Sequence, residues 1–168
     1  MTDARDLLKT RRSVAAAFLA EPAPDDEQLA EILTVASRVP DHGKLTPWRF
    51  VVFRGDARVA AGEALARRYA ELHPEADTEQ LAGERNRLAK APLVVAVVSR
   101  AAPHAKIPEF EQLLSAGAAT MNLIHGTHAL GFAANWVTGW IAYDRNAPLI
   151  GDVLTELYSS QGSTIAGQ

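Results

Sequence analysis

Residues 109–130 read EFEQLLSAGAATMNLIHGTHAL and are the most informative segment of the sequence. It predicts one long helix, and Gly131 follows it as the residue type at which helices commonly end. The middle of the stretch is made of small residues, from Ser115 to Ala119. Because small side chains let a neighbouring element approach closely, we expect this helix to lie at the centre of the fold.

Shorter helices are expected elsewhere in the chain. Asp25 is a good N-cap with Gln28 three residues on, and apolar residues recur after it at helical spacing. This helix should end at Arg38, because Pro40 disfavours helical geometry in the residue before it. The other helices are predicted over residues 3–10, 57–73, 78–90 and 147–157.

Strands are predicted between these helices. Residues 48–53 are rich in aromatic and β-branched side chains and end at the turn residues Gly55 and Asp56. Residues 93–98 are uniformly apolar, which is typical of a strand covered on both faces. Residues 133–141 predict a strand with a turn.

The composition fits one soluble α/β-type domain over residues 1–168, with 48% apolar and 22% charged residues and no dividing linker. The net charge is −3 and the basic residues are scattered, so no nucleic-acid partner is expected. The absence of cysteine excludes thiolate chemistry and cysteine-based metal sites. The apolar runs are too short for a membrane span or a signal peptide, which predicts no membrane partner and a cytoplasmic location.

Dedicated catalytic motifs are missing from the sequence, including glycine-rich phosphate loops and the nucleophile elbow. His125 and His128 could share a helix face as a metal pair would, but no carboxylate lies one turn away. Packed or interface histidines are therefore favoured, and no metal site is predicted. Asp41 beside His42 could suggest a hydrolytic couple, yet adjacent loop residues point apart and Ser13 would lack an oxyanion pocket. A hydrolase is not favoured, and no catalytic side chain is predicted.

Arg11, Arg12 and Ser13 follow the first predicted helix and offer two guanidinium groups and a hydroxyl, a set that suits a phosphate. The alternative is structural, because basic residues at a helix C-terminus gain ~0.3–1 kcal/mol from its dipole without any ligand. Arg38, at the end of the second predicted helix, has the same alternative. Trp48 is more often a core residue than a cofactor contact.

The order of the motifs is more informative than any one of them. They are Arg11-Arg12-Ser13, Arg38-Val39-Pro40-Asp41-His42 leading to Pro47-Trp48-Arg49-Phe50, Ser115-Ala116-Gly117-Ala118, and Gly131-Phe132 to Asn135-Trp136. This order and spacing resembles the nitroreductase family, specifically a short bacterial subgroup with Asp-His in the loop where longer relatives carry serines and asparagine. The resemblance runs from about Asp3 to Asn146.

The resemblance implies an α+β fold, a nitroreductase-like α/β/α sandwich whose mixed sheet is flanked by helices. It also implies an intertwined homodimer with FMN at the interface, in which the long helix packs against its symmetry mate. The implied FMN-binding residues are Arg11, Arg12, Ser13, Arg38, His42, Trp136, Val137 and Thr138. The segment that the subgroup links to NAD(P) consists of Gly126, Thr127, His128, Ala129, Leu130 and Gly131.

The function implied is an FMN-dependent oxidoreductase that transfers a hydride from NADPH or NADH through the flavin to a small-molecule acceptor. Nitroaromatic, quinone-like or enone acceptors would react by a ping-pong mechanism. The flavin carries such chemistry while the protein supplies position and electrostatics, and Arg11 or Arg12 would stabilise the anionic reduced flavin. A flavin-consuming or dehalogenating member of the same superfamily is a further possibility, since fold does not fix chemistry.

The C-terminus departs from the family pattern. Relatives continue past the last helix into a strand with a Gly-Thr-Pro-like turn, whereas this chain runs through residues 158–168 without one. The C-terminal strand is therefore expected to be shortened or missing, which leaves a neighbouring strand edge unpaired. This departure supports the alternative function, a non-catalytic flavin-binding dimer acting as sensor or carrier, or an inactive, C-terminally altered form of the enzyme.

Overall fold

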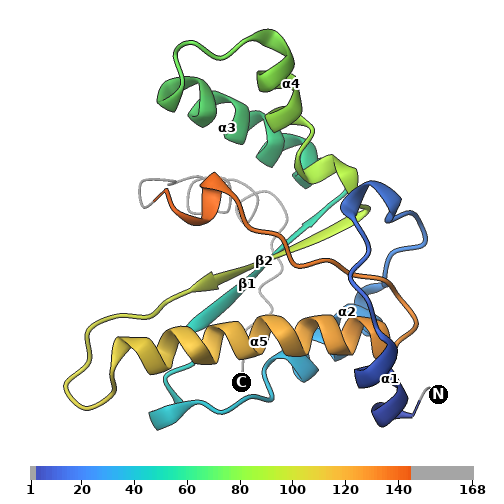
Figure 1. Ribbon diagram of the computed structural model, residues 1–168, viewed down its shortest axis with the longest axis vertical. Helices are drawn as coiled ribbons and strands as arrows, with labels where there is room; N and C mark the ends of the chain where they lie inside the picture. Colours follow the sequence, from blue (N-terminus) through green and yellow to red (C-terminus); the bar gives the residue numbers. More distant parts are fainter. Residues whose placement is uncertain (1–2, 145–168) are drawn as a thin grey trace. The chain divides into compact units, whose positions relative to one another are not determined.

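The computed structural model describes residues 3–144 of the chain. These residues form two compact units, each with its own helices (Figure 1). The first unit comprises residues 3–52 and 91–136, and the second comprises residues 53–90 and 137–144. The helix predicted over 147–157 and the shortened C-terminal strand lie outside the described residues.

The first unit is built from helices α1, α2 and α5 and a small sheet. Helix α1 spans Ala4–Thr10, α2 spans Asp26–Ala36 and α5 spans Glu109–Ala129, while strands β1 and β2 span Trp48–Arg54 and Leu93–Ser99. The strands are antiparallel neighbours, and the Arg100 N–H donates to the Pro47 carbonyl at 2.8 Å where β2 ends beside the start of β1. Helices with an antiparallel sheet place the chain in the predicted α+β class.

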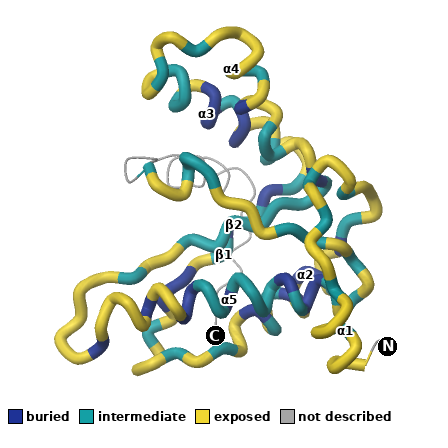
Figure 2. The backbone as a smooth tube through the Cα atoms, in the orientation of Figure 1, coloured by how far each residue is buried: buried dark blue, intermediate teal, exposed yellow. Residues whose placement is uncertain are grey.

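Helix α2 begins where the sequence predicts. The Asp25 carboxylate accepts the Gln28 N–H at 2.9 Å, and the Gln28 side chain accepts the Asp25 N–H at 3.0 Å. This reciprocal capping box satisfies two amide groups that a helix start leaves without partners. Helix α2 carries buried positions along its length (Figure 2). Its buried residues are Leu29, Ile32 and Ala36, and their spacing places them on one helical face.

Helix α5 is the central helix of the first unit, as the sequence predicts. It contacts α1, α2 and β2. A β-carbon at Gly126 would lie 3.2 Å from the Val35 side chain of α2, so glycine permits this close approach. The small residues Ala116 and Ala119 pack with Trp48 in a buried cluster against the sheet. Gly131, with φ of 86°, follows the helix end in the left-handed conformation expected there.

The second unit contains helices α3 and α4, which span Asp56–Leu72 and Thr78–Arg85. Glycine is required where the two helices meet, because a β-carbon at Gly62 would overlap the backbone carbonyl oxygen of Arg85. The Glu84 carboxylate accepts hydrogen bonds from Arg87 and from the Trp140 indole. Burial alone would raise the pKa of Glu84, but these hydrogen bonds outweigh it and the pKa is lowered.

Two predictions are wrong: the strand over residues 133–141 and the end of the helix over residues 78–90. Residues 133–141 do not form a strand; Trp140–Ala142 is a 3₁₀ turn, and the Ala134 carbonyl accepts a single bond from Val14. Aromatic and β-branched residues raise strand propensity there, but no strand within residues 3–144 pairs with this segment. The helix predicted over 78–90 ends at Arg85, where the Asn86 side chain donates to the Ala82 carbonyl at 3.0 Å and competes with the helical pattern.

The uniformly apolar strand β2 is confirmed, but its coverage is partial. Residues 93–98 all have intermediate exposure within the described part of the chain. Val97 packs on the cluster around Ala119, so α5 provides cover for the sheet. Residues 3–144 therefore leave β2 partly exposed, whereas the sequence predicts a strand covered on both faces.

Candidate functional site

The Arg-Arg-Ser segment lies directly after α1. Arg12 Nη1 donates to the Arg11 carbonyl at 2.9 Å and to the Lys9 carbonyl at 3.4 Å, so the Arg12 guanidinium caps the C-terminal end of α1. The Val14 N–H donates to the Ala134 carbonyl at 3.2 Å. This bond brings the Arg-Arg-Ser segment beside the chain that leads to Trp136, two pieces that are far apart in the sequence.

The charge of Arg11 acts on two histidines in the C-terminal half of α5. Burial, and next the positive charge of Arg11, lower the pKa of His125 below its ordinary value. The pKa of His128 is lowered by burial and then by Arg11 and His125. The same positive field that disfavours a second cation near Arg11 favours an anion there, so the Arg11 environment suits a phosphate.

His125 and His128 of α5 are both half-buried. Within residues 3–144, His125 Nδ1 and His128 Nε2 are buried atoms without a hydrogen-bond partner, and no group of three or more metal-ligating side chains gathers. His125 lines a shallow cavity of about 300 Å³ between α1, α2 and α5, whose other walls include Leu7, Ile32 and Leu130.

We expect the stability of the chain to fall as the pH drops below about 6.5. The folded pKa of His125 and of His128 is lowered, so the unfolded chain takes up protons in this range before the folded chain does. Their stabilising contribution is complete above the unfolded pKa and is lost as the pH falls. Thermal denaturation between about pH 8 and pH 5 should show a smaller drop in Tm for a His125→Gln, His128→Gln variant than for the wild type. A His73→Gln control should keep the full drop, and equal drops in all three proteins would contradict this origin.

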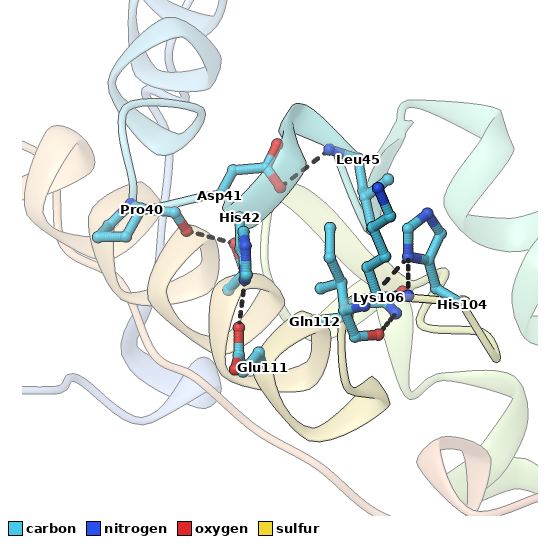
Figure 3. A network of polar contacts seen from close by, with 10 residues as sticks. Pro40, Asp41, His42, Leu45, His104, Lys106, Glu111 and Gln112 are labelled. Atoms are coloured by element: carbon cyan, nitrogen blue, oxygen red, sulfur yellow. Dashed lines mark hydrogen bonds and ion pairs between the residues drawn. The ribbon is translucent and has the colours of Figure 1, made fainter.

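The segment from Arg38 to His42 is held by polar side chains of α5. Ser115 Oγ donates to the Pro40 carbonyl at 2.5 Å, and Asn122 Nδ2 donates to the Arg38 carbonyl at 2.9 Å. His42 Nδ1 lies 2.7 Å from a carboxylate oxygen of Glu111 (Figure 3). Positions 111, 115 and 122 share one face of a helix, so a single α5 face fixes this segment.

The following loop is conformationally demanding. Gly43, Lys44 and Thr46 have φ of 72°, 55° and 44°. The left-handed region is unfavourable for a β-branched residue such as Thr46 and persists only where surrounding contacts enforce it. The Asp41 carboxylate supplies those contacts. It accepts the Leu45 N–H at 3.1 Å (Figure 3) and the Thr46 N–H at 2.8 Å.

The predicted flavin residues divide between the two units. Arg11, Arg12, Ser13, Arg38, His42 and Trp136 belong to the first unit, and Val137 and Thr138 to the second. Trp136 is 49% exposed and Val137 is 69% exposed, so both present apolar surface. In the predicted NAD(P) segment, Gly126 and Thr127 are buried, and the Phe132 N–H donates to the Thr127 carbonyl at 3.1 Å.

Sequence reasoning missed the residues of α5 that hold the Arg38–His42 segment. Their spacing at 111, 115 and 122 was visible as polar positions on one helical face. The sequence did not indicate which loop that face would meet.

Comparison with known proteins identifies the class of the chain. A model of the family described as "Nitroreductase family" matches residues 8–156. The chain therefore belongs to the nitroreductase family and is an oxidoreductase.

Curated relatives agree with this assignment. The chain is 38% identical over 137 residues to "Putative NAD(P)H nitroreductase YdjA" of Escherichia coli K12, a match that covers 82% of this chain and 73% of the relative. It is 39% identical over 141 residues to "Putative NAD(P)H nitroreductase" of Haemophilus influenzae, covering 83% of this chain and 74% of the relative.

Solved structures share the fold. A nitroreductase-like family protein from Bacillus cereus superposes with a TM-score of 0.71 at 21% identity, covering 92% of this chain and 78% of that protein. A mutant of NfnB from Sphigopyxis sp. strain HMH, described as an FMN and NADPH-dependent nitroreductase, gives a TM-score of 0.66 at 20% identity, covering 89% and 81%. Among the described residues, no helix combines the length and apolar character needed to cross a membrane.

Proposed function

We propose that the chain is an FMN-dependent NAD(P)H oxidoreductase that reduces nitroaromatic, quinone-like or enone acceptors in a ping-pong cycle. Family membership and the relatives named as NAD(P)H nitroreductases support this proposal. The observation that carries it for this chain is the hydrogen bond from Val14 to Ala134, which brings the Arg-Arg-Ser segment beside the chain that leads to Trp136.

The residues present fit FMN. A phosphate needs positive charge and donors, which Arg11 and the exposed Ser13 hydroxyl provide. Arg12 would have to release its bonds to the Lys9 and Arg11 carbonyls to add a second guanidinium. Arg38 and His42 would contribute from the segment fixed by α5, and Trp136, Val137 and Thr138 would line the ring system.

When bound, FMN supplies the ring that takes a hydride from NADPH or NADH and passes the electrons to the acceptor. The chain's own contribution is binding and electrostatics. A guanidinium of Arg11 or Arg12 beside the flavin would stabilise negative charge on it, since preorganised positive groups need no rearrangement during reaction. The six residues from Gly126 to Gly131 are the proposed nicotinamide nucleotide contact.

Steady-state oxidation of NADPH and NADH by the purified, FMN-loaded chain tests this function. With a nitroaromatic or a quinone as second substrate, we expect parallel double-reciprocal lines, the pattern of a ping-pong cycle. Bound FMN that neither nucleotide reduces would contradict the enzyme and support the non-catalytic flavin-binding alternative.

We also propose that the chain is a homodimer through α5. Phe110, Leu113 and Leu114 are 67%, 49% and 57% exposed, and a β-carbon at Gly117 would meet no atom within 4 Å. These positions recur at i, i+3, i+4 and i+7 and so form one apolar helix face. A two-fold interface brings the same face of both copies together, which would cover this apolar stripe.

Leu114→Glu is expected to shift the chain from dimer to monomer. A carboxylate placed at the centre of an apolar interface would meet its own symmetry mate and lose its water. Light scattering coupled to gel filtration measures the mass directly. Leu72→Glu is the matched control, because Leu72 is also exposed but lies on α3 of the second unit. A monomeric wild type, or an L114E variant of unchanged mass, would contradict the α5 interface.

A further inference from the structure

The pairing of His42 with Glu111 has no explanation in stability alone. The two side chains are 62% and 45% exposed, and exposed ion pairs contribute little to folding. They are nevertheless joined across 69 positions of sequence, with His42 Nδ1 at 2.7 Å from Glu111 Oε2 (Figure 3). A carboxylate at this distance can instead determine which nitrogen of the His42 imidazole carries the hydrogen.

Glu111, and not the neighbouring Asp41, is the carboxylate that contacts the His42 ring. The neighbouring Asp41 carboxylate is occupied at both oxygens by the Leu45 and Thr46 N–H groups. The His42 backbone is held on the same α5 face, because Ser115 binds the carbonyl of Pro40 two residues earlier. Both ends of the contact are thus fixed by the first unit itself.

We propose that Glu111 is a positioning residue for His42: by accepting the Nδ1–H it selects one tautomer and leaves Nε2 as the ring nitrogen available to the flavin site. This inference rests on the proposed function, in which His42 contributes to FMN binding. A neutral imidazole carries one N–H, and a carboxylate accepts hydrogen bonds but does not donate them. The neutral ring must therefore carry its hydrogen on Nδ1 and offer a lone pair at Nε2.

This tautomer defines the kind of ligand group that His42 recognises. A lone pair at Nε2 accepts a hydrogen bond, so its partner must be a donor, such as a hydroxyl or a ring N–H of the flavin. With the opposite tautomer, Nε2 would donate and would select an acceptor such as a carbonyl or a phosphate oxygen. Glu111 thereby determines specificity without touching the ligand.

Long-range ¹H–¹⁵N correlation spectra of the full chain read the tautomer directly, at alkaline pH where imidazoles are neutral. We expect the Nδ1-protonated pattern for His42, assigned by its loss in His42→Gln, and a change to the Nε2-protonated pattern in Glu111→Ala. Glu109→Ala is the matched control, since Glu109 is also acidic and lies in the same first turn of α5. An Nε2-protonated His42 in the wild type would overturn the proposal.

FMN affinity tests the consequence of the tautomer. Fluorescence titration should show about three- to tenfold weaker binding for Glu111→Ala than for Glu109→Ala, the effect of one lost hydrogen bond. Equal affinities would overturn the positioning role. Failure of the wild type to bind FMN would instead contradict the proposed function, and the tautomer spectra need no bound flavin. The two failures are therefore distinguishable.

Discussion

Replacing Arg11 with alanine is expected to weaken FMN binding by about tenfold to a hundredfold, the effect of losing a hydrogen bond to a charged group. Arg11 is half-buried beside α5, and its charge is already felt by His125 and His128. The positive charge of Arg11 disfavours protonation of these histidines, and the same charge would attract a phosphate. Fluorescence titration of the flavin-free chain with FMN measures the loss.

Arg5→Ala is the matched control for this change. Arg5 is an exposed arginine in the first turn of α1, so its removal costs the same net charge at the opposite end of the helix. FMN affinity should be unchanged within about twofold, because exposed charges at this separation are screened by salt. Equal losses in the Arg11 and Arg5 variants would mean that net charge, and not a phosphate site at Arg11, governs binding.

A second readout separates the field of Arg11 from any role in flavin binding. Removing Arg11 should raise the pKa of His125 and His128 toward the ordinary value, although burial will still hold each of them below it. A titration followed by NMR in the absence of FMN measures both groups. An unchanged pKa in Arg11→Ala would show that the guanidinium does not face α5.

Gly62→Ala and Gly83→Ala are expected to change stability in opposite directions. A β-carbon at Gly62 would overlap the Arg85 carbonyl oxygen at the contact of α3 with α4, where no flexible side chain can yield. Such overpacking costs about 1–3 kcal/mol. A β-carbon at Gly83 meets nothing within 4 Å, so alanine there should gain about 0.5–1 kcal/mol from its higher helix propensity.

Chemical denaturation of the two variants against the wild type measures this pair of effects. Both substitutions are the same chemical change within one helical hairpin, so each serves as the control for the other. Stabilisation by Gly62→Ala would contradict the close packing of α3 on α4.

Much of the fold could be predicted because its signals are local. The Asp25–Gln28 capping box and the stop at Gly131 depend on residues within one turn of each other. The uniformly apolar run of β2 is a local signal as well. These elements have the predicted type, and their boundaries differ from prediction by a few residues.

The strand prediction over residues 133–141 is wrong for a different reason. Its composition favours a strand, but a strand exists only when another strand presents a matching edge. In the part of the chain that the structure describes, the segment at Val14 supplies one backbone bond to Ala134, and no strand pairs with residues 133–141. That information is not contained in the local sequence.

In the site too, local motifs could be predicted and contacts between distant residues could not. Arg11, Arg38 and His42 could be singled out from motif order. The face of α5 that fixes the Arg38–His42 segment could not. Ser115 and Glu111 meet their partners 75 and 69 positions away. The spacing along α5 predicts a shared face, but only the folded chain shows that this face holds the Arg38–His42 segment.

The absorption spectrum of the purified 168-residue chain, recorded before and after anaerobic addition of NADPH, shows whether the chain binds FMN and whether the nucleotide reduces it. We expect a yellow protein with a stoichiometric amount of FMN, whose flavin band bleaches when the nucleotide is added. A colourless chain that stays folded but takes up no FMN on reconstitution would contradict it.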